Sequence, residues 1–287
     1  MKLSPFEMID YCKIDLENTI NSGQVFLWQK LKNNWYGIDG QNVLRINKSC
    51  KIKTYSKQKT DFFREKDDIK RIIQSICKDK TTKHAVDEFF GLRLLRQDPF
   101  QCFISFIVSS NSNIQKIKFT LENICKNFGE KILFDGKEFF LFPEPKMLAS
   151  ASVEDVKNCG AGYRSKYIIE ASKMVVSDEI DFDYLKKSSY EQAKEVLCKV
   201  PGIGNKVADC ILLFSLEKLE SFPLDRWTIR ILQKYFPSIF EIHTKGITDK
   251  QYNILHEKTR EYFGPYAGFA QQFLFKMERE NYQKGWL

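Results

Sequence analysis

The first 80 residues contain short runs of apolar or alternating apolar and polar residues, a pattern typical of strands. Pairs of turn-forming residues separate these runs at Asn33-Asn34, Asp39-Gly40 and Asn47-Lys48. Short connections of this kind join neighbouring antiparallel strands. We therefore predict an antiparallel meander of four strands, at residues 24–29, 34–38, 43–47 and 51–55.

From about residue 67 the apolar positions recur every three or four residues, as in amphipathic helices. Residues 131–145, which contain Gly136, Pro143 and Pro145, are expected to connect two helices. The predicted fold is α+β, with an N-terminal antiparallel sheet domain at residues 1–80 and an all-helical body at residues 81–287. Helices are expected at 69–77, 85–90, 99–109, 114–128, 153–158, 164–176, 250–263 and 266–281.

A glycine-rich break between two helical patterns is the most informative local feature. Ser188 to Glu191 matches a capping box, and an apolar stripe at helical spacing follows it up to Val200. Pro201-Gly202-Ile203-Gly204 then interrupts the helix, and a second helical stripe begins at Val207. We predict a helix-hairpin-helix at about residues 190–215. Its turn, with Gly202 and Gly204, would direct backbone N–H groups toward a DNA phosphate.

Lys206 lies in the first turn of the second predicted helix, and Asp225 follows that helix. The positive end of the helix dipole disfavours an ammonium group there, and burial would favour the neutral amine further. A neutral lysine amine is a nucleophile. These residues alone leave two other interpretations open: a DNA-binding hairpin without catalysis, and a surface lysine with Asp225 as a helix N-cap.

Composition narrows the class of protein. The net charge of +8 is compatible with a nucleic-acid partner, and 24 phenylalanines can supply a large core. The sequence has neither the long apolar run of a transmembrane helix nor that of a signal peptide, so we expect no membrane contact and a cytoplasmic location. The eight cysteines form no C-x-x-C pair and the three histidines are scattered, so no metal site is predicted.

Five segments, in order along residues 14–278, resemble one enzyme family. Residues 198–225 resemble the helix-hairpin-helix-Gly-Pro-Asp superfamily of DNA glycosylases, and the Lys-Val-Ala-Asp-Cys run within them is similar to the 8-oxoguanine DNA glycosylase branch. Gly162-Tyr163-Arg164 is a short further match. The three longer matches are 22–28, 94–114 and 264–275. The order of the segments is more specific than any one of them.

The resemblance implies a base excision repair enzyme that flips 8-oxoguanine out of duplex DNA, releases the base and nicks the strand. It assigns Lys206 as the nucleophile that attacks C1′ and forms a Schiff base. It assigns Asp225 to stabilising the positive charge that develops on the sugar. Strand cleavage by β-elimination would follow base release, so both glycosylase and lyase activities are expected.

The resemblance also implies a pocket for the flipped base. Cys210 and Phe275 would sandwich the base, and the Gln271 amide would bind its Watson–Crick edge. The carbonyl of Gly23 would accept the N7 proton that 8-oxoguanine has and guanine lacks. From the residues alone, Phe275 and Cys210 could equally be core residues and Gly23 a strand bulge.

Other matched positions would contact the opened duplex. Tyr163 would enter the base stack, and Asn111 and Arg164 would bind the estranged cytosine. Lys116 stands where the family commonly has a second arginine, and lysine cannot form the planar pair of hydrogen bonds that arginine can. We therefore predict a relaxed preference for the opposite base.

A second departure concerns the DNA backbone. Trp227 replaces the family's histidine, and Glu278 represents the acidic partner of that histidine, so a different phosphate contact is expected.

The resemblance implies no cofactor. No cysteine follows Cys210, which excludes the iron–sulfur cluster of some relatives, although a monovalent or divalent cation could bind at the hairpin together with DNA. The expected partner is double-stranded DNA containing 8-oxoguanine, bound by a monomer, in the nucleus if the source is eukaryotic. A glycosylase for another damaged purine is the alternative enzyme, but such relatives often lack the hairpin lysine that Lys206 supplies.

Overall fold

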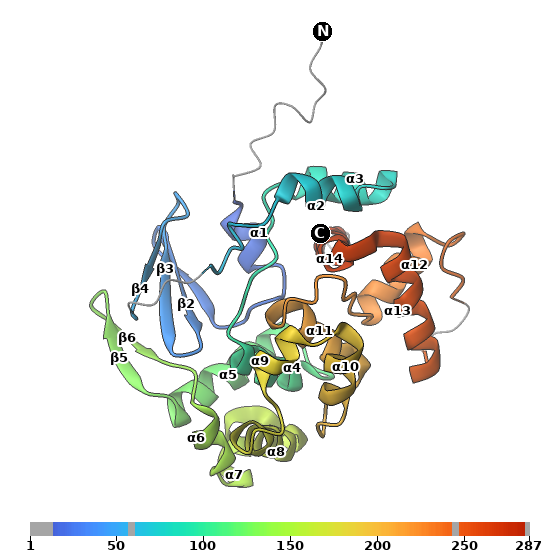
Figure 1. Cartoon of the computed structure of the whole chain (residues 1–287). Coiled ribbons are helices and arrows are strands. Elements are labelled where there is room, and N and C mark those ends of the chain that lie inside the picture. Colours follow the sequence, from blue (N-terminus) through green and yellow to red (C-terminus); the bar gives the residue numbers. More distant parts are fainter. Residues whose placement is uncertain (1–13, 57–60, 243–246, 285–287) are drawn as a thin grey trace.

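The computed structural model describes residues 14–56, 61–242 and 247–284 of the 287-residue chain (Figure 1). A four-stranded sheet near the N-terminus is followed by a mostly helical body, which confirms the predicted α+β class. One short helix, α1 (Leu16–Ile20), precedes the strands. The N-terminal strands are β1 (Trp28–Leu31), β2 (Asn34–Asp39), β3 (Asn42–Ile46) and β4 (Ile52–Thr54).

These four strands form the predicted antiparallel meander, in the order β1-β2-β3-β4. Gly37 on β2 pairs with Trp28 on β1, and a Cβ at Gly37 would lie 2.0 Å from the indole, so only glycine fits there. The strand predicted at 24–29 is wrong over residues 24–27, because β1 begins at Trp28. Gln24 does not join the sheet. Its buried side-chain amide instead donates a hydrogen bond to the Arg93 carbonyl and accepts one from the Leu95 N–H, both at 2.8 Å.

The helical body agrees with the prediction most closely at α4 (Pro99–Ser109) and α5 (Ile114–Phe128), where both bounds match. The remaining helices before the hairpin are α2 (Ile69–Ile76), α3 (Lys80–Glu88), α6 (Pro145–Ala149), α7 (Val153–Val156), a π-helical segment (Lys157–Ala161), a 3₁₀ turn (Gly162–Arg164), α8 (Ser165–Val176) and α9 (Phe182–Lys187). From the hairpin onward they are α10 (Tyr190–Cys198), α11 (Asn205–Ser215), α12 (Arg226–Tyr235), α13 (Asp249–Phe263), a 3₁₀ turn (Gly264–Tyr266) and α14 (Ala267–Lys284).

The predicted connection at 131–145 is instead a β-hairpin, β5 (Lys131–Phe134) and β6 (Lys137–Phe140), followed by the start of α6. Its two-residue turn, Asp135-Gly136, has positive φ at both positions, as tight hairpins require. Arg45 and Lys53 of the N-terminal sheet form ion pairs with Asp135. The body is therefore helical apart from this hairpin, which lies against the sheet (Figure 1).

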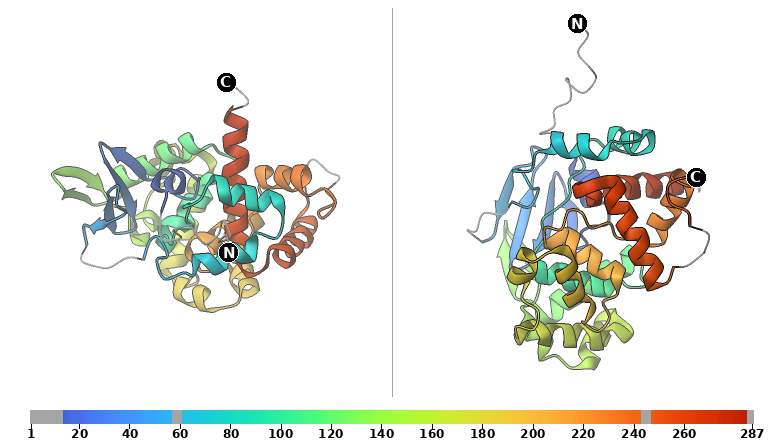
Figure 2. Two further views of the ribbon diagram at one scale, coloured as in Figure 1. Left: turned by 90° about the horizontal axis from the view of Figure 1, so that it is seen from above. Right: turned by 45° about the vertical axis from the view of Figure 1, so that its right-hand side comes forward.

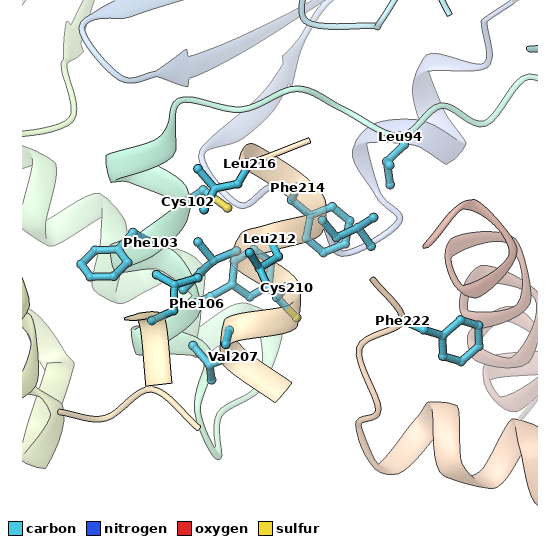
Figure 3. Packing of buried hydrophobic residues seen from close by; sticks show 14 of the residues in the cluster. Leu94, Cys102, Phe103, Phe106, Val207, Cys210, Leu212, Phe214, Leu216 and Phe222 are labelled. Carbon is cyan, nitrogen blue, oxygen red and sulfur yellow. The ribbon is translucent and has the colours of Figure 1, made fainter. Parts of the chain in front are cut away.

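The core is centred on α4 and α11 (Figure 3), where the rings of Phe106 and Phe214 stack at 5.4 Å. The same buried cluster takes Phe26 from the segment before β1 and Phe273 from α14. Seen from above, α14 lies between the N-terminal strands and the pair α12–α13 (Figure 2). This placement brings the end of the chain beside residues near its beginning. The domain boundary at residue 80 stays a prediction.

Candidate active site

The helix-hairpin-helix consists of α10, a turn at residues 199–204, and α11. Its capping box is formed by Ser189 and Gln192, one residue later than predicted, because the Ser189 hydroxyl accepts from the Gln192 N–H. Gly202 has a φ of +86°, and a Cβ there would lie 2.6 Å from the Tyr167 ring. Gly204 is the N-cap of α11, without a side-chain cap, and its missing Cβ would point into open space. The first N–H groups of α11 are thus open to an anion.

A buried carboxylate fixes the hairpin from inside. Asp209 on α11 accepts hydrogen bonds of 2.5 Å from the hydroxyls of Tyr190 and Tyr252, which come from α10 and α13. His256 lies beside them and accepts the Phe222 N–H at 3.0 Å through Nε2. Burial lowers the pKa of His256 to about 4, so its imidazole is neutral at pH 7. This network sets the direction of α11 and of the residues at its start.

Lys206 is the second residue of α11, and its Nζ lies 5.5 Å from the centre of the Phe106 ring. One turn further along, Cys210 is 4% exposed. Burial raises the pKa of the Cys210 thiol to about 12, although the charge of Lys206 and a hydrogen bond with it act in the opposite direction. The thiol therefore stays protonated and is a poor nucleophile, whereas the amine next to it faces an aromatic, weakly polar surface.

Asp225 is the N-cap of α12, as expected from the interpretation in which this residue caps a helix. Its Oδ1 accepts the Thr228 N–H at 2.7 Å and the Thr228 hydroxyl at 3.0 Å. Capping occupies one carboxylate oxygen and leaves the other available. The charges of Lys206 and Asp225 both act on the Cys210 thiol, Lys206 lowering its pKa and Asp225 raising it.

Gln271 on α14 reaches the same place from another element. Its Nε2 donates to the Thr228 hydroxyl at 3.3 Å. Its Oε1 is buried and accepts no hydrogen bond from the part of the chain that the structure describes. A buried amide oxygen without a donor is costly, and such atoms are typical of binding sites.

Gly23 is held against α14. The neighbouring Gln272 donates to the Ser22 carbonyl at 3.0 Å, and Gly23 itself has a φ of +88°. A Cβ at Gly23 would lie 3.4 Å from the Phe275 ring. The structure thus brings Gly23 beside Phe275, and Cys210 beside Lys206. Sequence reasoning missed Thr228 and Gln272; Gln272 adjoins Gln271, and its polar side chain within a buried stretch is the available signal.

The residues predicted to contact the opened duplex form a second group. Asn111 is exposed and has a positive φ of 47°, and Tyr163 is 61% exposed. Lys116 is exposed, with its Nζ 5.6 Å from the centre of the Phe119 ring. The Tyr163 ring contacts Tyr167, the residue that packs on Gly202, so this group continues into the hairpin.

Arg164 is the residue whose surroundings differ most from expectation. It is buried, and its guanidinium donates to the backbone carbonyls of Ser110, Asn111 and Ala161. Arg164 holds the loop that carries Asn111 instead of facing outward. A direct contact between Arg164 and an estranged base stays a prediction. It would require the guanidinium N–H groups to bind the base as well as these backbone carbonyls.

The structure shows what replaces the polar pair expected around Trp227. The Trp227 indole packs edge-on against Tyr282 at 5.0 Å, with Arg230 near its face. Glu278 pairs with Lys234 at 3.0 Å and accepts from the Tyr235 hydroxyl at 2.8 Å. Trp227 and Glu278 thus have separate partners.

Across 14–56, 61–242 and 247–284, no cluster of three histidine, cysteine or acidic side chains could hold a metal ion. Over the same residues, no helix has the length and apolar character needed to span a membrane.

Comparison with known proteins identifies the family. Residues 104–255 match the HhH-GPD superfamily base excision DNA repair protein, and residues 8–103 match the 8-oxoguanine DNA glycosylase N-terminal domain. A probable N-glycosylase/DNA lyase of Methanothermobacter thermautotrophicus is 33% identical over 227 residues, which cover 72% of this chain and 70% of the relative. The N-glycosylase/DNA lyase of Saccharomyces cerevisiae is 35% identical over 214 residues, but the match covers only 57% of its length.

Solved structures agree with this result. The 8-oxoguanine glycosylase/lyase of Clostridium acetobutylicum, in complex with double-stranded DNA containing cytosine opposite 8-oxoguanine, superposes with a TM-score of 0.83. It is 32% identical, and the match covers 94% of this chain and 93% of that one. The chain therefore belongs to the HhH-GPD superfamily of base excision DNA repair proteins, in its 8-oxoguanine DNA glycosylase branch.

Proposed function

We propose that this protein is a bifunctional N-glycosylase and DNA lyase that excises 8-oxoguanine from duplex DNA and nicks the strand at the resulting abasic site. The observation that carries the proposal is the buried Oε1 of Gln271, which accepts no hydrogen bond from the described residues. The same side chain is linked to Asp225 by hydrogen bonds through the Thr228 hydroxyl. An acceptor in that place suits the N1–H and N2–H donors of a guanine-type base. A DNA-binding hairpin without catalysis would leave this oxygen without a role.

Base release begins at Lys206. Its neutral amine attacks C1′ while the bond between C1′ and the base breaks, and the bonding electrons leave with the base, which then takes up a proton. The free oxygen of Asp225 stabilises the positive charge that develops on the sugar.

Strand cleavage follows from the same amine. Opening of the sugar gives a Schiff base between Lys206 and C1′, and the ring oxygen takes up a proton. The Schiff base acidifies the proton on C2′, which is lost to solvent as the bond between C3′ and its oxygen breaks and the phosphate leaves. Water then hydrolyses the Schiff base and frees the lysine.

Recognition of the base divides among three elements. Phe275 on α14 and Cys210 on α11 sandwich the base, and Gln271 accepts from its Watson–Crick edge. The Gly23 carbonyl accepts the N7 proton of 8-oxoguanine and repels the N7 lone pair of guanine. The support is the position of Gly23 beside Phe275, together with its φ of +88°, a backbone conformation that residues with a side chain rarely adopt.

The opposite strand is held by the exposed group. Tyr163 enters the base stack, and Asn111, Lys116 and Arg164 bind the estranged base. Lys116 offers a single flexible donor group in place of a planar fork, so the enzyme accepts several opposite bases.

The hairpin completes the DNA contact. The turn with Gly202 and Gly204 binds a backbone phosphate, and a monovalent or divalent cation can join it there when DNA is bound. Trp227 contributes a backbone contact at the edge of the site. One chain carries every group that the reaction needs, so the monomer is the active form.

The test is single-turnover incision of a labelled duplex with one 8-oxoguanine, beside the same duplex with guanine. We expect cleavage of the 8-oxoguanine strand alone, and none by Lys206→Gln. An inactive wild-type protein, or equal cleavage of both duplexes, would overturn the proposal.

A further inference from the structure

Arg279 is a charged residue that the reaction described above does not use. It lies on α14 one helical turn beyond Phe275, with its guanidinium carbon 5.4 Å from the centre of the Phe275 ring. Its Nη1 lies 3.0 Å from the position that a Cβ would take at Gly23. Gly23, Ile114 and Arg279 also border a cavity of about 540 Å³. The guanidinium is therefore part of the wall of a space that a ligand can enter.

The Nη1 of Arg279 has no partner. It is buried and forms no hydrogen bond within the part of the chain that the structure describes. The nearest acidic neighbour in sequence, Glu280, pairs with Lys276 at 2.6 Å. Burial lowers the pKa of the Arg279 guanidinium, and the charges of Glu280 and Asp225 act in the opposite direction without offsetting it. A buried donor without an acceptor costs stability, and proteins tolerate that cost where a ligand supplies the acceptor.

The position of Nη1 indicates which ligand atom would accept its hydrogen bond. The Gly23 carbonyl is expected to face N7 of the base, and C8 is the ring atom next to N7. A donor beside Gly23 therefore faces the substituent on C8. Guanine has only a hydrogen there, whereas 8-oxoguanine has a carbonyl oxygen, which can accept a hydrogen bond.

We infer that Arg279 is a specificity-determining residue whose Nη1 donates a hydrogen bond to the C8 oxygen of the flipped base. The inference rests on the proposed function. It adds a direct contact with the atom that distinguishes the oxidised base from guanine. A ring-opened purine that retains its formyl oxygen offers a similar acceptor and belongs to the same substrate class.

Two assays separate base recognition from the rest of the reaction. The first is single-turnover release of 8-oxoguanine, and the second is cleavage of a duplex with a preformed abasic site, which has no base to recognise. The variants are Arg279→Leu and Arg279→Met, which remove the donor and keep an apolar stem. The matched control is Arg71→Leu, at an exposed arginine on α2.

We expect both Arg279 variants to release 8-oxoguanine about 10- to 100-fold more slowly, the effect of losing one charged hydrogen bond. Abasic-site cleavage stays at the wild-type rate, and the melting temperature rises because an unpaired buried donor is removed. Wild-type rates of 8-oxoguanine release by the variants would overturn this inference alone, and so would an equal loss of both activities. A wild-type protein that is inactive on 8-oxoguanine overturns the proposed function together with it.

Discussion

Gln271 donates a 3.3 Å hydrogen bond to the hydroxyl of Thr228, and that hydroxyl donates a 3.0 Å hydrogen bond to Asp225. One hydroxyl thus joins the side chain that reads the base to the carboxylate beside the reacting sugar. Gln271 lies on α14, and Asp225 is the N-cap of α12. We expect a change in one to affect the other.

The first prediction concerns the removal of the Thr228 hydroxyl. Thr228→Val keeps the shape of the side chain but leaves Gln271 without its acceptor and Asp225 with one hydrogen bond fewer. We expect release of 8-oxoguanine to slow by about tenfold or more, measured in single turnover. Thr259→Val is the control, because its buried hydroxyl bonds with the His256 carbonyl away from this site. Equal rates for Thr228→Val and wild type would show that the link has no role in catalysis.

The second prediction concerns the opposite base. Lys116 lies over Phe119 at the edge of the group that surrounds Tyr163. We expect the wild-type protein to release 8-oxoguanine at similar rates opposite all four bases. Lys116→Arg should raise the rate opposite cytosine relative to adenine, because arginine restores two parallel donors. Single-turnover rates on four duplexes measure both effects, and a wild type that strictly requires cytosine would contradict the prediction.

The third prediction compares the two glycines of the hairpin turn. Gly202→Ala places a Cβ against Tyr167 at positive φ, so it should destabilise the fold by about 2 kcal/mol in chemical denaturation. Gly204→Ala enters open space and should destabilise the fold much less, by under about 1 kcal/mol for the change of N-cap residue. It should nevertheless weaken binding of duplex DNA by about tenfold, because the methyl group obstructs the approach of a phosphate. A folded Gly204→Ala that binds duplex DNA with wild-type affinity would argue against a phosphate at this turn.

The fourth prediction concerns pH. Burial lowers the pKa of His256 from 6.5 to about 4, so the unfolded chain binds a proton more readily than the folded protein does. The contribution of His256 to stability is therefore complete above pH 6.5 and is lost as the pH falls toward 4. At pH 5 the loss is about 2 kcal/mol. Chemical denaturation at pH 7 and pH 5 measures it, and His256→Gln should reduce the difference; an unchanged difference would assign the loss to other groups.

The helices with clear caps could be predicted from the sequence. Asp98 precedes Pro99 at the start of α4, and Asn113 caps α5 by accepting the Lys116 N–H at 2.9 Å. The β5–β6 hairpin was missed because Gly136, Pro143 and Pro145 favour a connection between helices over residues 131–145. Its strands are stabilised by contacts with the distant N-terminal sheet, which local sequence does not reveal.

The residues of the site could be predicted because the sequence resembles a known family. The contacts that surround these residues could not be predicted in this way. No motif marks Arg279, although its helical spacing from Phe275 places both residues on one face. Residue spacing did not indicate that the Arg164 guanidinium donates to the backbone carbonyls of the loop that carries Asn111. Such bonds depend on how separate segments meet in space, which residue spacing alone does not determine.

The central claim is that Lys206 forms the covalent bond with DNA. Borohydride reduction during the reaction on an 8-oxoguanine duplex, followed by peptide mass spectrometry, tests it most directly. We predict a stable protein–DNA adduct on the peptide that contains Lys206, and no adduct with Lys206→Gln. Release of 8-oxoguanine without an adduct, or an adduct on another amine, would contradict the account.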